Sequence, residues 1–157
     1  MIAHSLIRVF VVLILSMSLS SAFAQPAKTS VRLDSVTGYW TTIDDKTGKV
    51  RSILHLWESH GVTYGRIEKI FQQPGDTGTC SSCPGQFRNK PILGLTIIWG
   101  LEKTGDRVWS GGEILDPHNG KEYRVMLTLA NDGRSLRARG YIGFSVFGRT
   151  QTWYRRF

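Results

Sequence analysis

The sequence predicts an all-β fold, a single eight-stranded antiparallel up-and-down barrel. Stretches of roughly ten residues with alternating or apolar character recur between residues 38 and 156, and short turns separate nearly all of them. No segment after residue 24 has a helical period of useful length. Because an open sheet of eight strands would expose two edges to pairing, we expect the sheet to close into a barrel.

Residues 1–24 have the features of a secretory signal peptide. A short segment with one basic residue, Arg8, precedes an unbroken apolar run at residues 9–15, and Ala22-Phe23-Ala24 fits the small-x-small cleavage rule. The alternative is a membrane anchor, but the apolar run is short for a hydrocarbon core of roughly 30 Å. We therefore expect cleavage between Ala24 and Gln25, a periplasmic or secreted protein, and no transmembrane span afterwards.

The remaining chain has the length of one ordinary domain. Residues 25–37 lack clear periodicity and are expected to form an N-terminal arm, whereas residues 38–157 form the β-barrel domain. The full chain carries 20 lysines and arginines against 12 acidic residues, a formal net charge of +8. In an exported protein this charge favours anionic ligands or envelope surfaces as partners, or serves solubility alone, and nucleic acid is not expected.

The first three strands are expected at residues 38–43, 49–58 and 62–72, joined by turns at residues 44–48 and 59–61. Both turns are rich in residues that favour turn geometry. Along the third strand, Tyr64 lies on the same side as Arg66 and Glu68. Such a mixed face suits a polar barrel lumen, and it suits a solvated strand equally well.

The connection at residues 73–93 is the one long loop expected in the domain. Long loops in compact domains are usually lids, binding elements or disordered segments. Residues 75–78 form a predicted turn within it, and Pro74, Pro84 and Pro91 restrict the rest. On a barrel this loop would lie across one mouth. A decorated turn without a ligand role is the alternative.

The last five strands are expected at residues 94–103, 107–115, 121–130, 134–142 and 149–156. The stretch from Trp109 to Tyr123 specifies two of them and their turn most clearly. Pro117 fixes φ in the turn, and Asn119-Gly120 tolerates positive φ. Before the turn, Gly111-Gly112 predicts a bulge or the close approach of a neighbour. After it, apolar and polar residues alternate with the period of a half-buried strand.

An eight-stranded barrel has an interior that is either filled by side chains or large enough for one small ligand. The five tryptophans fall on five different expected strands, where they would pack a core or line a pocket. The residues that we predict to contact a ligand are Trp40, Trp57, Tyr64, Arg66, Trp99, Trp109 and Tyr123.

Cys80-Ser81-Ser82-Cys83 has three interpretations. A redox pair would place its first thiol at a helix N-terminus, but Pro84-Gly85 follows at once and no helix is expected. A zinc site would need a second pair of ligands, and no histidine lies at a suitable spacing. A short structural disulfide between Cys80 and Cys83 fits an oxidising compartment and is favoured.

No catalytic residue, metal site or cofactor is predicted, and the protein is more simply a binding protein than an enzyme. The sequence has no glycine-rich phosphate loop, no His-Glu-x-x-His and no Gly-x-Ser-x-Gly. Asp44, Asp45 and Asp116 lie in turns, where aspartate is favoured for turn geometry alone.

Several short motifs together resemble an uncharacterised bacterial family, number 2147 among domains of unknown function. They are Gly38-Tyr39-Trp40, Pro91-x-x-Gly94-Leu95, the Trp109–Tyr123 stretch, Arg139-Gly140-Tyr141-x-Gly143 and Gly148-Arg149-Thr150-x-x-Trp153. The resemblance covers residues 38–156. It implies a small exported protein with a calycin- or lipocalin-like barrel, in a family where a cysteine pair is common, and it implies no activity.

The leading hypothesis is an exported barrel that holds a small, partly apolar or anionic ligand. One alternative is a thiol-disulfide redox protein that uses Cys80 and Cys83. The other is an envelope interaction module with a filled barrel, whose basic surface would comprise Arg134, Arg137, Arg139, Arg155 and Arg156.

Overall fold

A computed structural model describes residues 33–157 and confirms the all-β barrel. The strands are β1 (Gly38–Ile43), β2 (Val50–Ser59), β3 (Val62–Ile70), β4 (Thr96–Gly105), β5 (Val108–Asp116), β6 (Lys121–Leu129), β7 (Ser135–Tyr141) and β8 (Gly148–Arg156), and a short 3-10 helix, η1 (Gly85–Phe87), lies in the long loop. The expected signal peptide and residues 25–32 of the expected arm lie outside the described residues.

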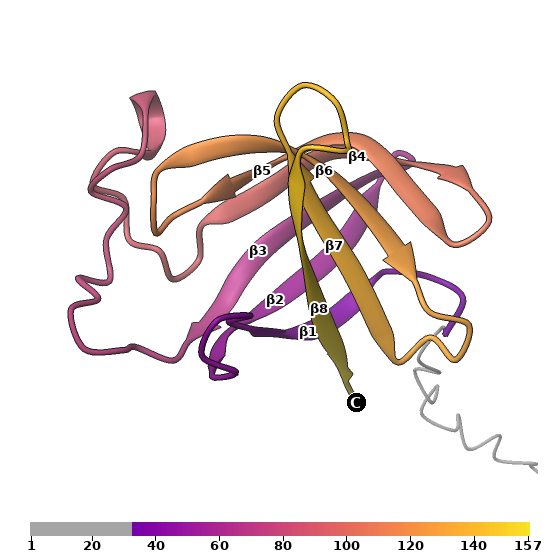
Figure 1. Ribbon diagram of the computed structural model, residues 1–157, viewed down its shortest axis with the longest axis horizontal. Coiled ribbons are helices and arrows are strands. Elements are labelled where there is room, and N and C mark those ends of the chain that lie inside the picture. The colour runs from indigo at the N-terminus through magenta and orange to yellow at the C-terminus, as the bar shows by residue number, and fades with distance from the viewer. Residues whose placement is uncertain (1–32) are drawn as a thin grey trace, which may run out of the picture.

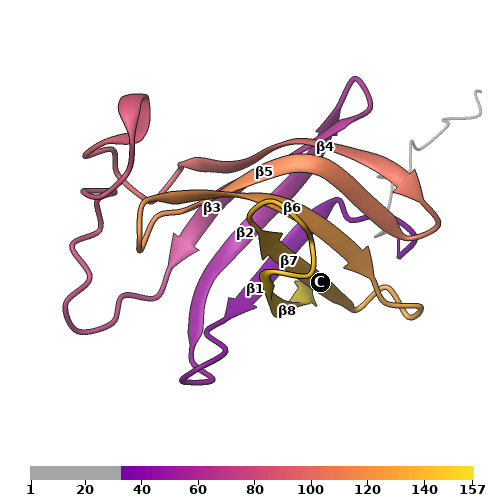
Figure 2. The same ribbon diagram turned by 45° about the horizontal axis from the view of Figure 1, so that its top comes forward.

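Each strand pairs antiparallel with the next in sequence, and the sheet closes where β1 pairs with β8 (Figures 1 and 2). The closing register sets Thr41 opposite Tyr154. Closure removes both free edges of the sheet, as expected. Within residues 33–157 no helix is long and apolar enough to span a membrane.

The predicted bulge at Gly111-Gly112 is present, since the register between β5 and β6 shifts between Trp109 and Gly112. Gly111 has a φ of +86°, which favours glycine. A Cβ on Gly112 would lie 2.6 Å from the backbone nitrogen of Leu101, so the missing side chain lets β5 approach β4 closely. The glycine pair therefore bends the strand where the barrel wall curves.

One end of the barrel, here called the closed end, carries the β2–β3, β4–β5 and β6–β7 turns. Its interior is filled by fully buried side chains: Trp40, Leu56, Leu101, Leu127 and Leu136. Gly65 contributes to this packing, because a Cβ there would lie 2.7 Å from Leu56 Cδ2. Half of the barrel is thus an ordinary packed core.

Arg155 on β8 ties residues 33–37 across the closed end. Its guanidinium donates hydrogen bonds to the carbonyl oxygens of Ser35 (2.5 Å), Thr37 (2.8 Å) and Gly133 (2.7 Å). It also lies 4.3 Å from the ring centroid of Trp40. Burial lowers the pKa of this guanidinium, but an arginine remains protonated in proteins. The buried charge is therefore stabilised by carbonyl dipoles and an aromatic face.

Candidate functional site

The other end of the barrel, here called the mouth, opens into a cavity of about 860 Å³. The β1–β2, β5–β6 and β7–β8 turns surround it, together with the long loop at residues 71–95, which projects away from the barrel wall (Figure 1). None of the side chains that fill the closed end lines this cavity. The interior is therefore packed at one end and open at the other.

The floor and walls of the cavity are apolar. Leu54, Ile67, Ile97, Val125, Ala138 and Trp153 line it, and all of them are buried residues of the strands. Gly140 also faces inward, because a Cβ there would meet Tyr123 and Ile114 at ordinary contact distances of 3.6 to 4.0 Å. Water forms few hydrogen bonds with such a lining, whereas an apolar ligand that binds there removes apolar surface from water, which is favourable.

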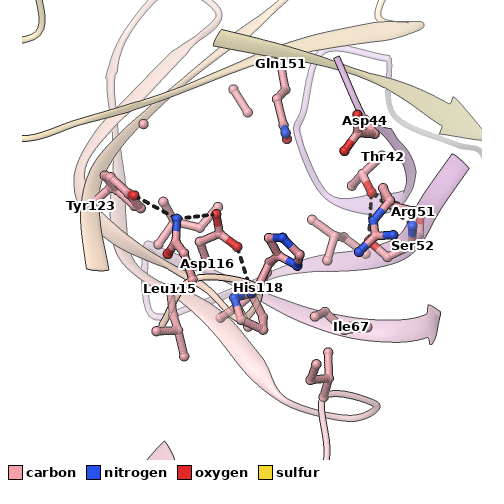
Figure 3. A pocket seen from close by; sticks show the side chains of 18 of the residues that line it. Thr42, Asp44, Arg51, Ser52, Ile67, Leu115, Asp116, His118, Tyr123 and Gln151 are labelled. Carbon is pink, nitrogen blue, oxygen red and sulfur yellow. Dashed lines mark hydrogen bonds between the residues drawn. The ribbon is translucent and has the colours of Figure 1, made fainter. Parts of the chain in front are cut away.

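A few polar groups interrupt the apolar lining. Thr42 and Ser52 share a hydrogen bond of 2.8 Å between β1 and β2, and Gln151 Oε1 accepts one of 3.2 Å from Trp153. Figure 3 shows Thr42 and Ser52 across the open space from Tyr123, with Gln151 pointing into it. Single polar groups in an otherwise apolar pocket fix the orientation of a ligand.

The Tyr123 side chain lines the cavity, and the β5–β6 turn holds its hydroxyl. The hydroxyl accepts a hydrogen bond of 3.0 Å from Asn119 Nδ2, and the same amide lies 3.0 Å from Asp116 Oδ2 (Figure 3). Because the hydroxyl is the acceptor in this contact, it retains its own hydrogen. Asp116 also accepts a hydrogen bond from the backbone N–H of His118, so the aspartate shapes the turn as the sequence predicted.

Two ion pairs hold the rim of the mouth. Arg51 on β2 lies 3.3 Å from Asp76 in the long loop, and Asp76 also accepts a hydrogen bond of 2.7 Å from the Gln73 backbone N–H. Asp45 in the β1–β2 turn pairs with Arg149 on β8. These contacts fasten the long loop to β2 and the β1–β2 turn to β8, the two strands that flank β1.

The attachment of the long loop is expected to loosen in acid. The Gln73 N–H, Arg51 and the nearby His118 hold the pKa of Asp76 below its ordinary value of 3.8, although burial opposes them. A carboxyl with a lowered folded-state pKa stabilises the structure above its unfolded pKa, and this contribution is lost as the pH falls through the folded pKa. The amide proton shift of Gln73, followed by NMR from pH 6 to pH 2, should therefore titrate with a midpoint below 3.8.

Asp76→Asn should abolish that titration, because the neutral amide keeps one acceptor but carries no charge. Asp106→Asn removes an exposed carboxylate from the β4–β5 turn at the closed end and should leave the Gln73 titration unchanged. A midpoint at or above 3.8 in the unsubstituted protein would contradict the assigned role of Asp76.

The disulfide interpretation of the cysteine pair is confirmed: Cys80 and Cys83 are joined, and both are buried, at 0% and 2% exposure. The loop between them packs on the β5–β6 turn, where Cys80 Sγ lies 3.7 Å from Pro117 O. A Cβ on Gly120 would overlap Ser82 O, so only glycine permits this contact. Closing so small a loop contributes about 2 kcal/mol in the chain-entropy account.

Comparisons with known proteins agree with this architecture. Residues 38–155 match the profile of a family described as an uncharacterized protein conserved in bacteria, DUF2147. The chain belongs to the DUF2147 family. This confirms the resemblance drawn from the sequence motifs. No curated protein matches the chain significantly.

A solved structure from Helicobacter pylori shares the fold of this DUF2147 protein. It is titled "Protein HP1028 from the human pathogen Helicobacter pylori belongs to the lipocalin family", and it matches with 23% identity and a TM-score of 0.68. The match covers 82% of this chain and 85% of the other. At this identity the likeness shows the fold, a lipocalin-like barrel, and nothing about the ligand.

The seven residues predicted to contact a ligand occupy four different places in this DUF2147 protein. Tyr123 lines the cavity. Trp40 and Trp109 are buried and do not line it. Trp99 donates a hydrogen bond to the exposed residue Glu113 and stacks on Phe87 of the long loop.

The other three, Trp57, Tyr64 and Arg66, lie together on the outer wall, where the two aromatic rings belong to a row. Trp57 stacks on Tyr64 with ring centroids 5.7 Å apart, and the Arg66 guanidinium lies 5.8 Å from the Trp57 ring. His55 and Tyr39 continue the row on β2 and β1. The structure therefore does not bring the seven residues into one site.

Sequence reasoning missed the polar cavity residues Thr42, Ser52 and Gln151. A signal for them was present, because side chains two positions apart on a strand share a face. Each lies two positions from a large buried residue on its strand, Trp40, Leu54 or Trp153. Within residues 33–157, no group of three or more histidine, cysteine or acidic side chains is placed to hold a metal ion.

Proposed function

We propose that this protein is an exported binding protein that holds one small amphiphile in the mouth half of its barrel. The observation that carries the proposal is the cavity of about 860 Å³ with an apolar floor and polar groups at its rim. Ligand sites typically measure about 300–1,000 Å³ and combine these two features. The leader-like residues 1–24 and the disulfide support export, since disulfides persist in oxidising compartments.

The proposed ligand has an apolar body and a polar or anionic head. Leu54, Val125 and Trp153 would contact the body. The head would lie at the rim beside Arg51 and Arg149, whose carboxylate partners occupy only part of the five donors of each guanidinium. Fatty acids and other single-chain lipids have this chemistry.

A titration with a fluorescent naphthylaminosulfonate dye tests the proposal, because the dye combines an aromatic body with an anionic group. We expect saturable one-to-one binding that a long-chain fatty acid displaces. Native mass spectrometry of protein purified from the exported fraction should also reveal a bound small molecule. The absence of both saturable dye binding and a co-purified molecule would contradict the proposal.

The two alternatives drawn from the sequence receive less support. Thiol–disulfide exchange requires an accessible sulfur, whereas both cysteines are buried and no α-helix follows them. A module with a filled barrel requires side chains throughout the interior, whereas the mouth half is open.

A further inference from the structure

We propose that the β7–β8 loop, residues 142–147, docks the mouth of the barrel on an anionic phospholipid bilayer. Its sequence, Ile-Gly-Phe-Ser-Val-Phe, carries no charge. Its four large apolar side chains are highly exposed: Ile142 (63%), Phe144 (79%), Val146 (78%) and Phe147 (75%). In Figure 1 the loop stands clear of the barrel wall at the top of the view. Four such side chains on one six-residue loop mark an interaction site rather than scattered surface residues.

Several backbone polar groups of this loop already have hydrogen-bond partners within the protein, as an apolar environment requires. Arg139 on β7 donates hydrogen bonds to the carbonyl oxygens of Ser145 (2.7 Å) and Val146 (3.0 Å) and to the Thr150 hydroxyl (2.9 Å). The Phe147 N–H donates to Phe144 O at 3.0 Å. Backbone groups that enter a lipid surface must find partners within the protein, because no water is there to satisfy them. Arg139 therefore satisfies carbonyl groups of the loop from β7, while the apolar side chains of the loop remain exposed.

The charge around the loop favours lipid phosphates over a second copy of this chain. Arg139 and Arg149 flank it in sequence and in the β7–β8 pairing; Arg149 pairs with Asp45, whereas the described contacts of Arg139 are to neutral oxygens, which leave its charge uncompensated. A symmetric dimer through this loop would bring two uncompensated Arg139 charges together, which is unfavourable. A bilayer rich in phosphatidylglycerol presents negative charge around an apolar interior, and so matches both features.

Docking at this loop would also place the cavity against the bilayer. Ile142 and Phe147 belong to the loop and line the cavity. The opening and the docking surface are therefore continuous. This inference concerns where the protein acts and stands independently of whether the cavity holds a ligand.

Vesicle co-sedimentation of protein purified from the exported fraction, after expression of the full chain, tests the proposal. We expect binding to phosphatidylglycerol vesicles, weaker binding to phosphatidylcholine vesicles, and loss of binding as salt is raised. The double variant Phe144→Ser, Val146→Ser should bind at least about tenfold more weakly, because it removes two of the apolar side chains that would insert into the bilayer surface. Phe157→Ser removes an equally exposed aromatic from the C-terminus, at the closed end, and should bind as the unsubstituted protein does.

A Phe144→Trp variant measures insertion of the loop into the bilayer separately from binding. Its added tryptophan should shift its emission to the blue on vesicle binding and be quenched by brominated lipid. Failure of the unsubstituted protein to bind phosphatidylglycerol vesicles would overturn the proposal, as would equal binding by the double variant. A dimer that this variant abolishes would instead assign the loop to a second copy. Neither Phe144 nor Val146 lines the cavity, so dye binding by the double variant should persist and keeps the two proposals distinguishable.

Discussion

Arg155→Ala is expected to lower the free energy of unfolding by about 3–5 kcal/mol. The substitution removes the donor for three carbonyl oxygens and the cation that faces Trp40, at a residue only 7% exposed. A hydrogen bond to a charged group contributes more than a neutral one, and each buried carbonyl left without a partner adds a further cost. Urea denaturation followed by tryptophan fluorescence measures the change.

Arg156→Ala is the matched control, because Arg156 is the next residue on β8 and is exposed. Its effect should stay within about 0.5 kcal/mol. An equal loss of stability in the two variants would show that Arg155 does not fasten the closed end.

Ala138→Phe is expected to weaken ligand binding by at least about tenfold, which corresponds to about 1.4 kcal/mol of binding free energy. Ala138 lies on β7 opposite Gln151 and Leu127 and lines the cavity. A phenyl group there would occupy the space that we assign to the apolar body of the ligand, while the closed end keeps its packing. The dye titration measures the loss, and the melting temperature reports on the fold.

Two further variants complete this test. Ala138→Leu adds a smaller group and should give an intermediate loss. Arg137→Ala changes the exposed neighbour on β7, which does not line the cavity, and should leave dye binding unchanged. Undiminished binding by a folded Ala138→Phe variant would place the ligand elsewhere.

The strands could be predicted because the signals for them are local. Turn residues such as Asp116 to Gly120 and the alternation from Tyr123 to Leu129 lie within a few residues of the structure they specify. The eight observed strands follow the expected ones closely. Closure followed from the cost of free edges, and required no knowledge of side-chain packing.

The cavity could not be predicted in the same way, because it depends on which face of each strand turns inward. In β2 both faces are apolar: Leu54 and Leu56 point into the barrel, whereas Trp57 joins the outer aromatic row. Aromatic character alone therefore assigned Trp57 to the same group as Tyr123. The bulge at Gly111 adds a second difficulty, since the inward positions change from odd at Trp109 to even at Ile114.

The division of the interior into a packed end and an open end also could not be predicted from the sequence. It follows from side chains contributed by all eight strands, each in a register that bulges shift at several points. Small polar residues such as Thr42 and Ser52 could not be recognised from the sequence as cavity-lining residues, because hydroxyl residues are common on any solvated strand.

The proposed ligand lies inside the mouth half of the barrel. Methyl NMR spectra recorded during titration with the naphthylaminosulfonate dye test this placement most directly, because methyl groups line both halves of the interior. We expect large shifts at Leu54, Ile67 and Val125 and small ones at Leu56 and Leu136. Unchanged methyl shifts at Leu54, Ile67 and Val125 when the dye is saturating would contradict it.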